Sequence, residues 1–146
     1  MKFKSYILPV VAGTMAGVML QVLGEKALHA TYPPAVGVQL NAKEDYVSYI
    51  STLPVTAFIL LLVNYIICTT IAGAIATLIP DHDTKRPALI TGIIITLGAI
   101  FNAMFMPFQP MWVSAMSIIV MIPSALLGYI VGRSMRQRKT SIPSSR

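Results

Sequence analysis

Two side chains that could bind a metal ion or exchange a proton lie at the end of the first apolar segment. Glu25 and His29 are four residues apart, so on a continuous helix they share one face, one turn apart. They could share a proton, or they could offer two ligands to a divalent cation. Two ligands are too few for a metal site, and no further His or Cys falls in this part of the sequence. We therefore keep both as weak metal candidates, beside the simpler interpretation of a solvated helix end, and predict no cofactor.

Other polar residues fall inside or beside the apolar segments. Most are expected at the outer side of a membrane, where they would form one polar cluster, with Asn64 at a deeper level. Such a cluster could bind an ion or a small molecule, because an unpartnered polar group in lipid is costly. An enzyme is disfavoured, since no nucleophile with a neighbouring base can be named. The expected cluster comprises Gln21, Glu25, His29, Asn64, Asn102, Gln109 and Trp112.

The composition indicates that these residues are carried by membrane-spanning helices. Of the 146 residues, 55% are hydrophobic and 11% are charged, whereas about a quarter are charged in soluble proteins. A helix needs about 20 residues to cross the hydrocarbon layer. The charge-free runs predict an all-α membrane protein with four transmembrane helices in an up-down-up-down bundle, and a short outer interfacial helix between the first two. The spans are expected at about 5–24, 54–79, 88–106 and 111–132, within one domain of residues 1–132.

The distribution of Lys and Arg predicts the orientation. If both termini are cytoplasmic, nine of the 11 basic residues lie on the inner side, and only Lys26 and Lys43 lie outside. This bias favours an inner-membrane protein with cytoplasmic N- and C-termini. Much of the net charge of +6 falls in residues 133–146, a basic cytoplasmic tail beside an anionic leaflet. Without stacking aromatic residues, this tail does not indicate nucleic-acid binding.

Glycines recur on the predicted helices at spacings that favour contact between helices. Gly13 and Gly17 form a GxxxG pair, and Gly24 lies on roughly the same face. Gly128 and Gly132 are also four residues apart, on the last span. In lipid, small residues stabilise helix pairs because they let two backbones approach closely. We predict that these five positions serve helix packing.

Two short motifs resemble an uncharacterised family of small four-helix bacterial inner-membrane proteins. They are E-x3-H-x2-YPP, which begins at Glu25, and N-x3-MP-x2-P-x-W, which begins at Asn102. The resemblance implies the bacterial inner membrane as the location and supplies no activity. In this family a histidine often lies in the outer turn before the fourth helix, where this chain has Phe108-Gln109-Pro110. That departure argues against a three-ligand metal site at the outer face.

Two functions of different classes follow from these features. The favoured one is an accessory or scaffold subunit, or a self-associating bundle, that acts through its small-residue strips. Its partners would be the lipid bilayer and a second copy or a larger membrane complex. The alternative is a small carrier or an ion- or metal-binding protein that uses Glu25, His29 and Asn102 at the outer face.

Overall fold

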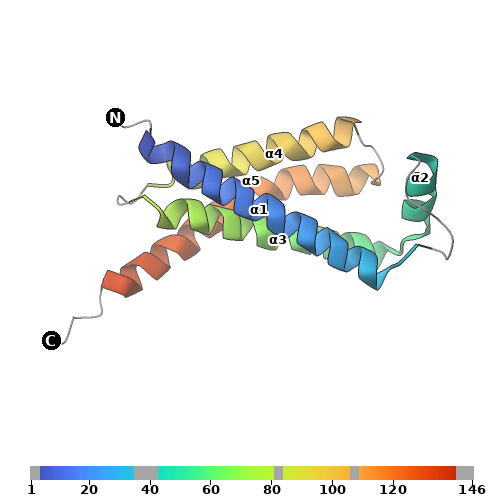
Figure 1. Cartoon of the computed structure of the whole chain (residues 1–146), viewed down its shortest axis with the longest axis horizontal. Helices are drawn as coiled ribbons and strands as arrows, with labels where there is room; N and C mark the ends of the chain where they lie inside the picture. The colour runs from blue at the N-terminus through green and yellow to red at the C-terminus, as the bar shows by residue number, and fades with distance from the viewer. Residues whose placement is uncertain (1–3, 35–42, 81–83, 106–108, 141–146) are drawn as a thin grey trace.

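Every regular element that the structure describes is an α-helix (Figure 1). The structure is a computed structural model of the chain, and it describes residues 4–34, 43–80, 84–105 and 109–140. These ranges contain five helices: α1 (Lys4–Thr31), α2 (Lys43–Thr52), α3 (Val55–Leu78), α4 (Arg86–Phe105) and α5 (Met111–Thr140). The all-helical class predicted from the sequence is therefore confirmed for the described residues.

Four of the helices are long and apolar enough to cross a membrane. The apolar segments are Tyr6–Thr31, Val55–Leu78, Arg86–Met104 and Met111–Arg138. Large apolar side chains such as Leu8, Leu97 and Ile119 are exposed around the outside of the bundle. A continuous apolar surface is unfavourable in water and favourable in lipid. The fold is thus compatible with a multi-pass integral membrane protein, as predicted.

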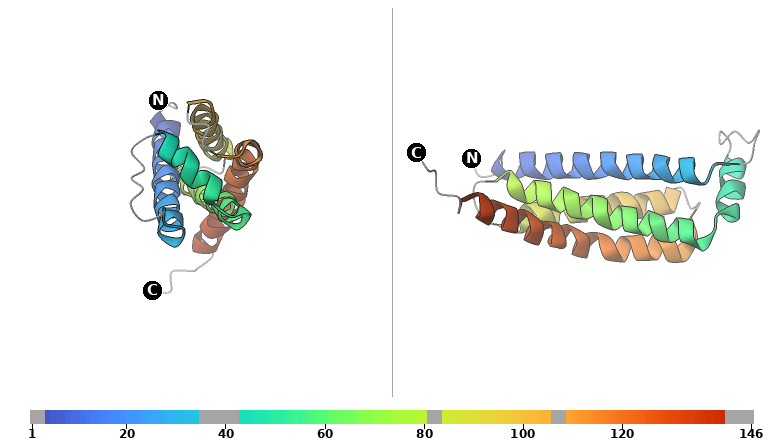
Figure 2. Two further views of the ribbon diagram at one scale, coloured as in Figure 1. Left: turned by 90° about the vertical axis from the view of Figure 1, so that its right-hand side faces the viewer. Right: turned by 90° about the horizontal axis from the view of Figure 1, so that it is seen from below.

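The four long helices lie side by side, and α3 contacts each of the other three (Figure 2). α4 also contacts both α1 and α5, but α1 and α5 do not touch each other within the described residues. The start of α1 and the end of α5 lie at one end of the bundle, and α2 lies across the opposite end (Figures 1 and 2). Because α1 and α5 are held apart, space remains between them.

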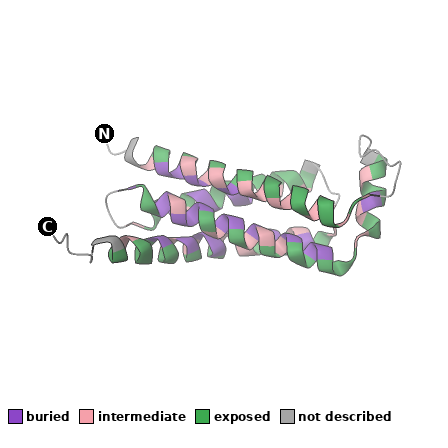
Figure 3. Ribbon diagram, turned by 60° about the horizontal axis from the view of Figure 1, so that its bottom comes forward, coloured by how far each residue is buried: buried purple, intermediate pink, exposed green. Residues whose placement is uncertain are grey.

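Many of the buried positions are on α3, and small and hydroxyl-bearing residues are frequent among them (Figure 3). Ala72 and Ala76 are fully buried there. The buried Thr77 hydroxyl donates a hydrogen bond of 2.8 Å to the Gly73 carbonyl in the turn before it. A bond of this kind satisfies a hydroxyl within its own helix, so that it can be buried at little cost. Large side chains also contribute to the core, in a buried cluster that includes Phe58 and Met121.

The glycines of α1 lie directly against α3. A Cβ atom added at Gly13 would lie 2.6 Å from the Ala72 carbonyl oxygen, and one added at Gly17 would lie 2.7 Å from the Ala72 Cβ. Both distances are below van der Waals contact, so any larger residue would force α1 and α3 apart. The predicted GxxxG pair therefore contacts another helix of the same chain.

The glycines of α5 make the same kind of contact on another face of α3. A Cβ added at Gly128 would collide with the Thr70 carbonyl oxygen, and one added at Gly132 would lie 2.9 Å from the Ala74 carbonyl oxygen. The backbones of α3 and α5 therefore approach closely, as small residues permit. α1 and α5 thus pack closely against two faces of α3.

Two helices continue beyond the spans expected from the sequence. α1 runs past Gly24 to Thr31, so Glu25 and His29 both lie on a helix, as their spacing required. α5 runs past Gly132 to Thr140 and includes the first part of the basic segment. The rest of that tail, residues 141–146, lies outside the described residues, as does 106–107 in the second family-like motif.

The basic extension of α5 is tied to the end of α3. The Arg136 guanidinium donates hydrogen bonds to the carbonyl oxygens of Thr77 and Pro80. The last carbonyls of a helix have no partner within it and carry partial negative charge, so a guanidinium is a favourable neighbour. This contact fixes the extension relative to the bundle.

Candidate functional site

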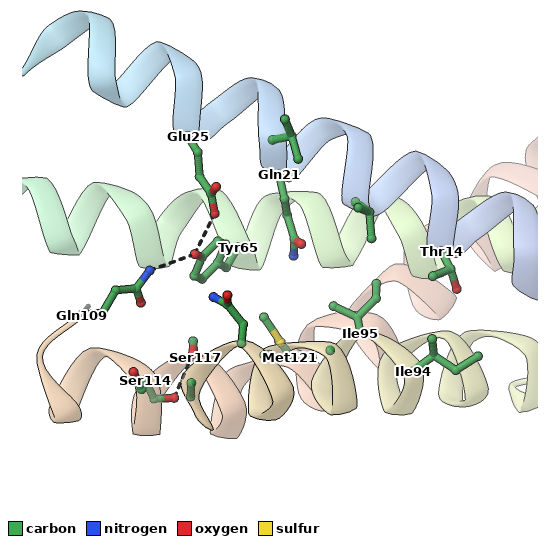
Figure 4. Close-up of a pocket in the computed structure, with 16 residues that line it drawn as sticks. Thr14, Gln21, Glu25, Tyr65, Ile94, Ile95, Gln109, Ser114, Ser117 and Met121 are labelled. Atoms are coloured by element: carbon green, nitrogen blue, oxygen red, sulfur yellow. Dashed lines mark hydrogen bonds between the residues drawn. The ribbon is translucent and has the colours of Figure 1, made fainter. Parts of the chain in front are cut away.

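One face of α1 lines a cavity in the half of the bundle nearer to α2 (Figure 4). Thr14, Val18, Gln21 and Glu25 follow one another at intervals of three or four residues, so their side chains point to the same side of α1. The other walls come from one face of α4, one face of α5, and Tyr65 of α3. The cavity therefore fills the space between α1 and α5. Its remaining lining residues are Val22, Ile94, Ile95, Gly98, Ala99, Asn102, Ala103, Gln109, Ser114, Ser117 and Met121.

The cavity is large enough for a small molecule and opens on one side. Its volume is about 460 Å³, within the range of about 300–1,000 Å³ that is typical of ligand sites. Tyr65, Met121 and Ser117, from α3 and α5, are at most 6% exposed. Val18 of α1 and Ile94 of α4 are 45% and 41% exposed. The mouth therefore lies between α1 and α4.

The Tyr65 hydroxyl joins three parts of the chain at the end of the cavity nearer to α2. It donates a hydrogen bond of 2.8 Å to Oε1 of Glu25 on α1. It also accepts a longer bond of 3.4 Å from Nε2 of Gln109, just before α5. Figure 4 shows the two bonds as a chain from Glu25 through Tyr65 to Gln109. A neutral phenol that bonds a carboxylate stabilises the negative charge without neutralising it.

Two polar atoms of the cavity residues have no hydrogen-bond partner. Gln21 Nε2 and Thr14 Oγ1 are shielded from solvent and bond to no protein group, and both side chains point from α1 into the cavity (Figure 4). Buried polar groups are nearly always paired in folded proteins, and an unpaired one costs about 1–3 kcal/mol. Their residues line the cavity, but the two atoms themselves are covered by protein, so a ligand bonds them only after the covering side chains shift.

Asn102 of α4 lines the cavity. The sequence analysis had placed it in the expected polar cluster. The residue is exposed, so it lies at the mouth. The structure thus brings together four residues of the expected cluster, namely Gln21, Glu25, Asn102 and Gln109.

Asn64 of α3 does not line the cavity. It lies in the contact between α3 and α1. Its Nδ2 donates a hydrogen bond of 3.4 Å to the Gln21 carbonyl, and its Oδ1 accepts one of 3.4 Å from the Cys68 thiol. A Cβ added at Gly24 would collide with the Asn64 side chain. Gly24 therefore makes room for this amide, and Asn64 holds two helices together instead of facing the cavity.

His29 does not face the cavity either. Its ring lies edge-on to two tyrosines of α2, with ring centres 5.6 Å from Tyr49 and 6.3 Å from Tyr46. The Tyr49 hydroxyl donates a hydrogen bond to the Tyr32 carbonyl, one residue after the end of α1. These contacts fasten α2 to the end of α1.

The environment of α2 favours the neutral form of its two tyrosines. Burial raises the pKa of Tyr46 above its ordinary value, and the nearby Glu25 carboxylate and Tyr49 raise it further. Burial also raises the pKa of Tyr49. Since the charge of Glu25 is felt at Tyr46, the polar end of the cavity and the α2 contact are electrostatically linked.

Trp112 packs outside the cavity. Its ring lies edge-on to Phe58 of α3, with ring centres 6.2 Å apart, and the residue is partly exposed. An exposed indole near the end of an apolar helix is typical of an anchor at a membrane surface. Trp112 therefore packs against α3 and does not line the cavity.

The two weak metal candidates have different neighbours. Glu25 bonds to Tyr65 inside the bundle, whereas His29 contacts the tyrosines of α2. No three His, Cys, Asp or Glu side chains approach one another closely enough to hold a metal ion within the described residues. The structure thus places Glu25 and His29 in two different environments.

The sequence analysis missed Tyr65, Thr14, Ser114 and Ser117. All four lie in apolar runs, where a single hydroxyl resembles a packing residue. Thr14 did carry a signal, because it falls on the same helical face as Gln21 and Glu25. Tyr65 carried none, because only the arrangement of three helices places its hydroxyl beside Glu25.

Comparisons with known proteins add no relative. No family model matches the chain, and no curated protein or solved structure matches it significantly. The family resemblance suggested by the two motifs therefore stays a prediction, and the geometry of the cavity is the basis for assigning a function.

Proposed function

We propose that this chain is a small-molecule-binding protein of the bacterial inner membrane and that its ligand occupies the cavity between α1, α4 and α5. One observation carries the proposal: an opening of about 460 Å³ is lined by mostly apolar side chains together with the polar residues Gln21, Glu25 and Tyr65. A cavity of this size with a few polar groups is typical of a small-molecule site. Binding in this cavity is also the step that a small carrier would require.

In the proposed arrangement the four long helices cross the bilayer alternately in an up-down-up-down bundle, with α2 at the outer surface. The distribution of Lys and Arg supports cytoplasmic termini. Single cysteines placed at the exposed Ser48 of α2 and Ser134 of α5 provide a test in cells. An impermeant thiol reagent should label the first from outside and reach the second only after the membrane is opened. The opposite pattern would reverse the orientation.

The scaffold hypothesis had its support in the small-residue strips. In the structure Gly13 and Gly17 contact α3, and so do Gly128 and Gly132. All four are accounted for by packing within one chain, so they give no specific reason to expect a second chain. Self-association stays a prediction from the sequence, and the cavity offers the stronger argument.

Gly98 provides a direct test of binding. This residue lines the cavity, and a Cβ added to it would meet no atom within 4 Å. Gly98→Leu should therefore fill the mouth without disturbing the helices. We expect native mass spectrometry of gently extracted wild-type protein to show a bound small molecule or lipid, and we expect Gly98→Leu to lose it.

A matched control is Ala115→Leu. Ala115 is exposed on α5 and does not line the cavity, so the larger side chain should leave the bound molecule in place. If wild-type protein carries no molecule, or if Gly98→Leu carries as much as wild type, the cavity is not a binding site and the proposal is wrong.

A further inference from the structure

The charge of the cavity indicates what kind of molecule it takes. Of the residues that line it, all of them within the described ranges, Glu25 alone is an acidic or basic residue. The Tyr65 hydroxyl bonds Oε1 of Glu25, and the carboxylate forms no ion pair with any described residue. A carboxylate inside a membrane protein normally has a cationic or coordinating partner, because burying the charge is costly. A cation in the cavity would supply that partner.

The shape of the cavity indicates an elongated ligand. Glu25 and Thr14 are eleven residues apart on α1, which is about 16 Å along a helix. Between the two levels the walls are mostly apolar, with Val18, Ile95 and Met121 among the lining residues. A molecule with a charged head beside Glu25 and a hydrocarbon body along α1 would match this pattern.

Gln21 adds a second polar point, one helical turn from Glu25. Its Nε2 has no partner and is covered by neighbouring side chains, and after a small shift of these it can donate a hydrogen bond to an acceptor on the ligand. A hydroxyl, ether or carbonyl oxygen close to the cationic head would meet it. The cavity thus distinguishes a head with a donor and an acceptor from a plain hydrocarbon.

The mouth indicates how such a molecule arrives. The exposed lining residues belong to α1 and α4, including Val18 and Ile94. These two helices carry apolar outer surfaces, so the mouth opens sideways into the lipid layer in the proposed arrangement. Molecules that dissolve in the membrane with a charged head near its surface are therefore placed to enter.

An ordinary phospholipid fits this cavity less well than a free amine. An ethanolamine headgroup carries an ammonium, but it also carries a phosphate that would need a basic residue nearby. None of the lining residues is Lys or Arg. The phosphate would thus remain unpaired close to Glu25, which disfavours the lipid.

From these observations we infer that the cavity binds a singly charged amphipathic amine, with its ammonium against Glu25 and its apolar body along α1 toward Thr14. The inference deepens the proposed function, on which it rests. The ammonium donates to the carboxylate, and the hydrocarbon body packs against the apolar walls.

Three probes with the same chain length test this inference. Full-length protein in phosphatidylcholine nanodiscs is heated with octylammonium, 1-octanol or octanoate, and unfolding is followed by helical circular dichroism. A ligand that binds the folded state raises the melting temperature in a concentration-dependent way. We expect octylammonium to raise it, octanol to raise it much less, and octanoate to have no effect.

Glu25→Gln shows whether the carboxylate is responsible. Gln keeps the size of the side chain and an acceptor for Tyr65, so folding should be retained. We expect the apparent affinity for octylammonium to fall at least about tenfold, since a hydrogen bond to a charged group contributes that much. Glu44→Gln is the matched control, because Glu44 is exposed on α2 and does not line the cavity. It should leave the affinity unchanged.

The outcomes separate the two proposals. If octanol stabilises as well as octylammonium and Gly98→Leu abolishes both effects, the cavity binds small molecules but the ligand class is wrong. Unchanged octylammonium affinity in Glu25→Gln would also overturn the ligand class. If no probe gives a stabilisation that depends on Gly98, both proposals fail. A Glu25-dependent stabilisation by added phosphatidylethanolamine, equal to that by octylammonium, would assign the site to a lipid headgroup instead.

Discussion

In the half of the bundle that contains the chain ends, α1 and α5 pack closely against α3, whereas in the half nearer to α2 the helices α1, α4 and α5 enclose a cavity. In the first half, glycines bring α1 and α5 so close to α3 that a single added Cβ at Gly13 or Gly128 would collide with backbone. In the second half, the cavity has a volume of about 460 Å³, and Gly98 faces open space. Because α1 also contacts α3 in the second half, at Gly24, the opening lies on the side of α1 that faces α4 and α5.

This contrast shows that small residues and polar residues have different structural roles in the bundle. A glycine that faces another helix lets the two backbones touch, as Gly13 and Gly128 do. Glu25, Tyr65 and Gln109 are longer, and their hydrogen bonds join helices at a distance. The packed half therefore holds the fold together, and the open half is free to bind.

Replacing a glycine in each half should give the largest difference. Gly128→Leu would drive a side chain into the Thr70 carbonyl, so we expect loss of folding or a fall of about 3 kcal/mol or more in the free energy of unfolding. Gly98→Leu meets no atom and should change it by at most about 1 kcal/mol. Denaturation in detergent micelles, followed by circular dichroism, measures both.

Equal losses in the free energy of unfolding for Gly128→Leu and Gly98→Leu would contradict the comparison of the two halves. They would mean that the half nearer to α2 is as tightly packed as the half with the chain ends, and that no cavity exists in solution. Gly132→Leu, whose Cβ would lie 2.9 Å from the Ala74 carbonyl oxygen, should resemble Gly128→Leu and serves as a second probe of the packed half.

The long helices could be predicted from the sequence because their signal is local. A charge-free run of about 20 residues is a span wherever it lies in the chain, and all four candidate spans are helices here. The glycine pairs were also readable, because a spacing of four residues fixes their common face. Which helix they contact was not readable, since the order of helices around a bundle leaves no mark in any one segment.

The site was predicted in part for the same reason. Gln21 and Glu25 could be placed together because one helix carries both. Asn64 and its neighbour Tyr65 are adjacent in sequence but point to different sides of α3, so Asn64 lies in the α1 contact and Tyr65 in the cavity. Only the positions of α1 and α5 around α3 decide which of the two faces the site.

Removal of the Tyr65 hydroxyl should have an intermediate effect. Tyr65→Phe keeps the ring but leaves the Glu25 carboxylate without its donor and Gln109 Nε2 without its acceptor. We expect the free energy of unfolding to fall by about 1–3 kcal/mol. Glu25→Gln should cost less, because the amide oxygen still accepts from Tyr65. If Tyr65→Phe is the milder of the two changes, the hydrogen bonds from Tyr65 to Glu25 and Gln109 do not stabilise the half of the bundle nearer to α2.

The smallest effect should come from two threonines that differ in their hydrogen bonding. The Thr77 hydroxyl in the packed half bonds the Gly73 carbonyl, whereas the Thr14 hydroxyl in the cavity wall bonds nothing. Valine has nearly the same shape as threonine. Thr77→Val should therefore destabilise by about 1 kcal/mol, and Thr14→Val should be neutral or slightly stabilising in the ligand-free protein. Equal losses at both positions would mean that Thr14 has a partner even without ligand, and the cavity would then lose one of the two unpaired groups that point to a bound molecule.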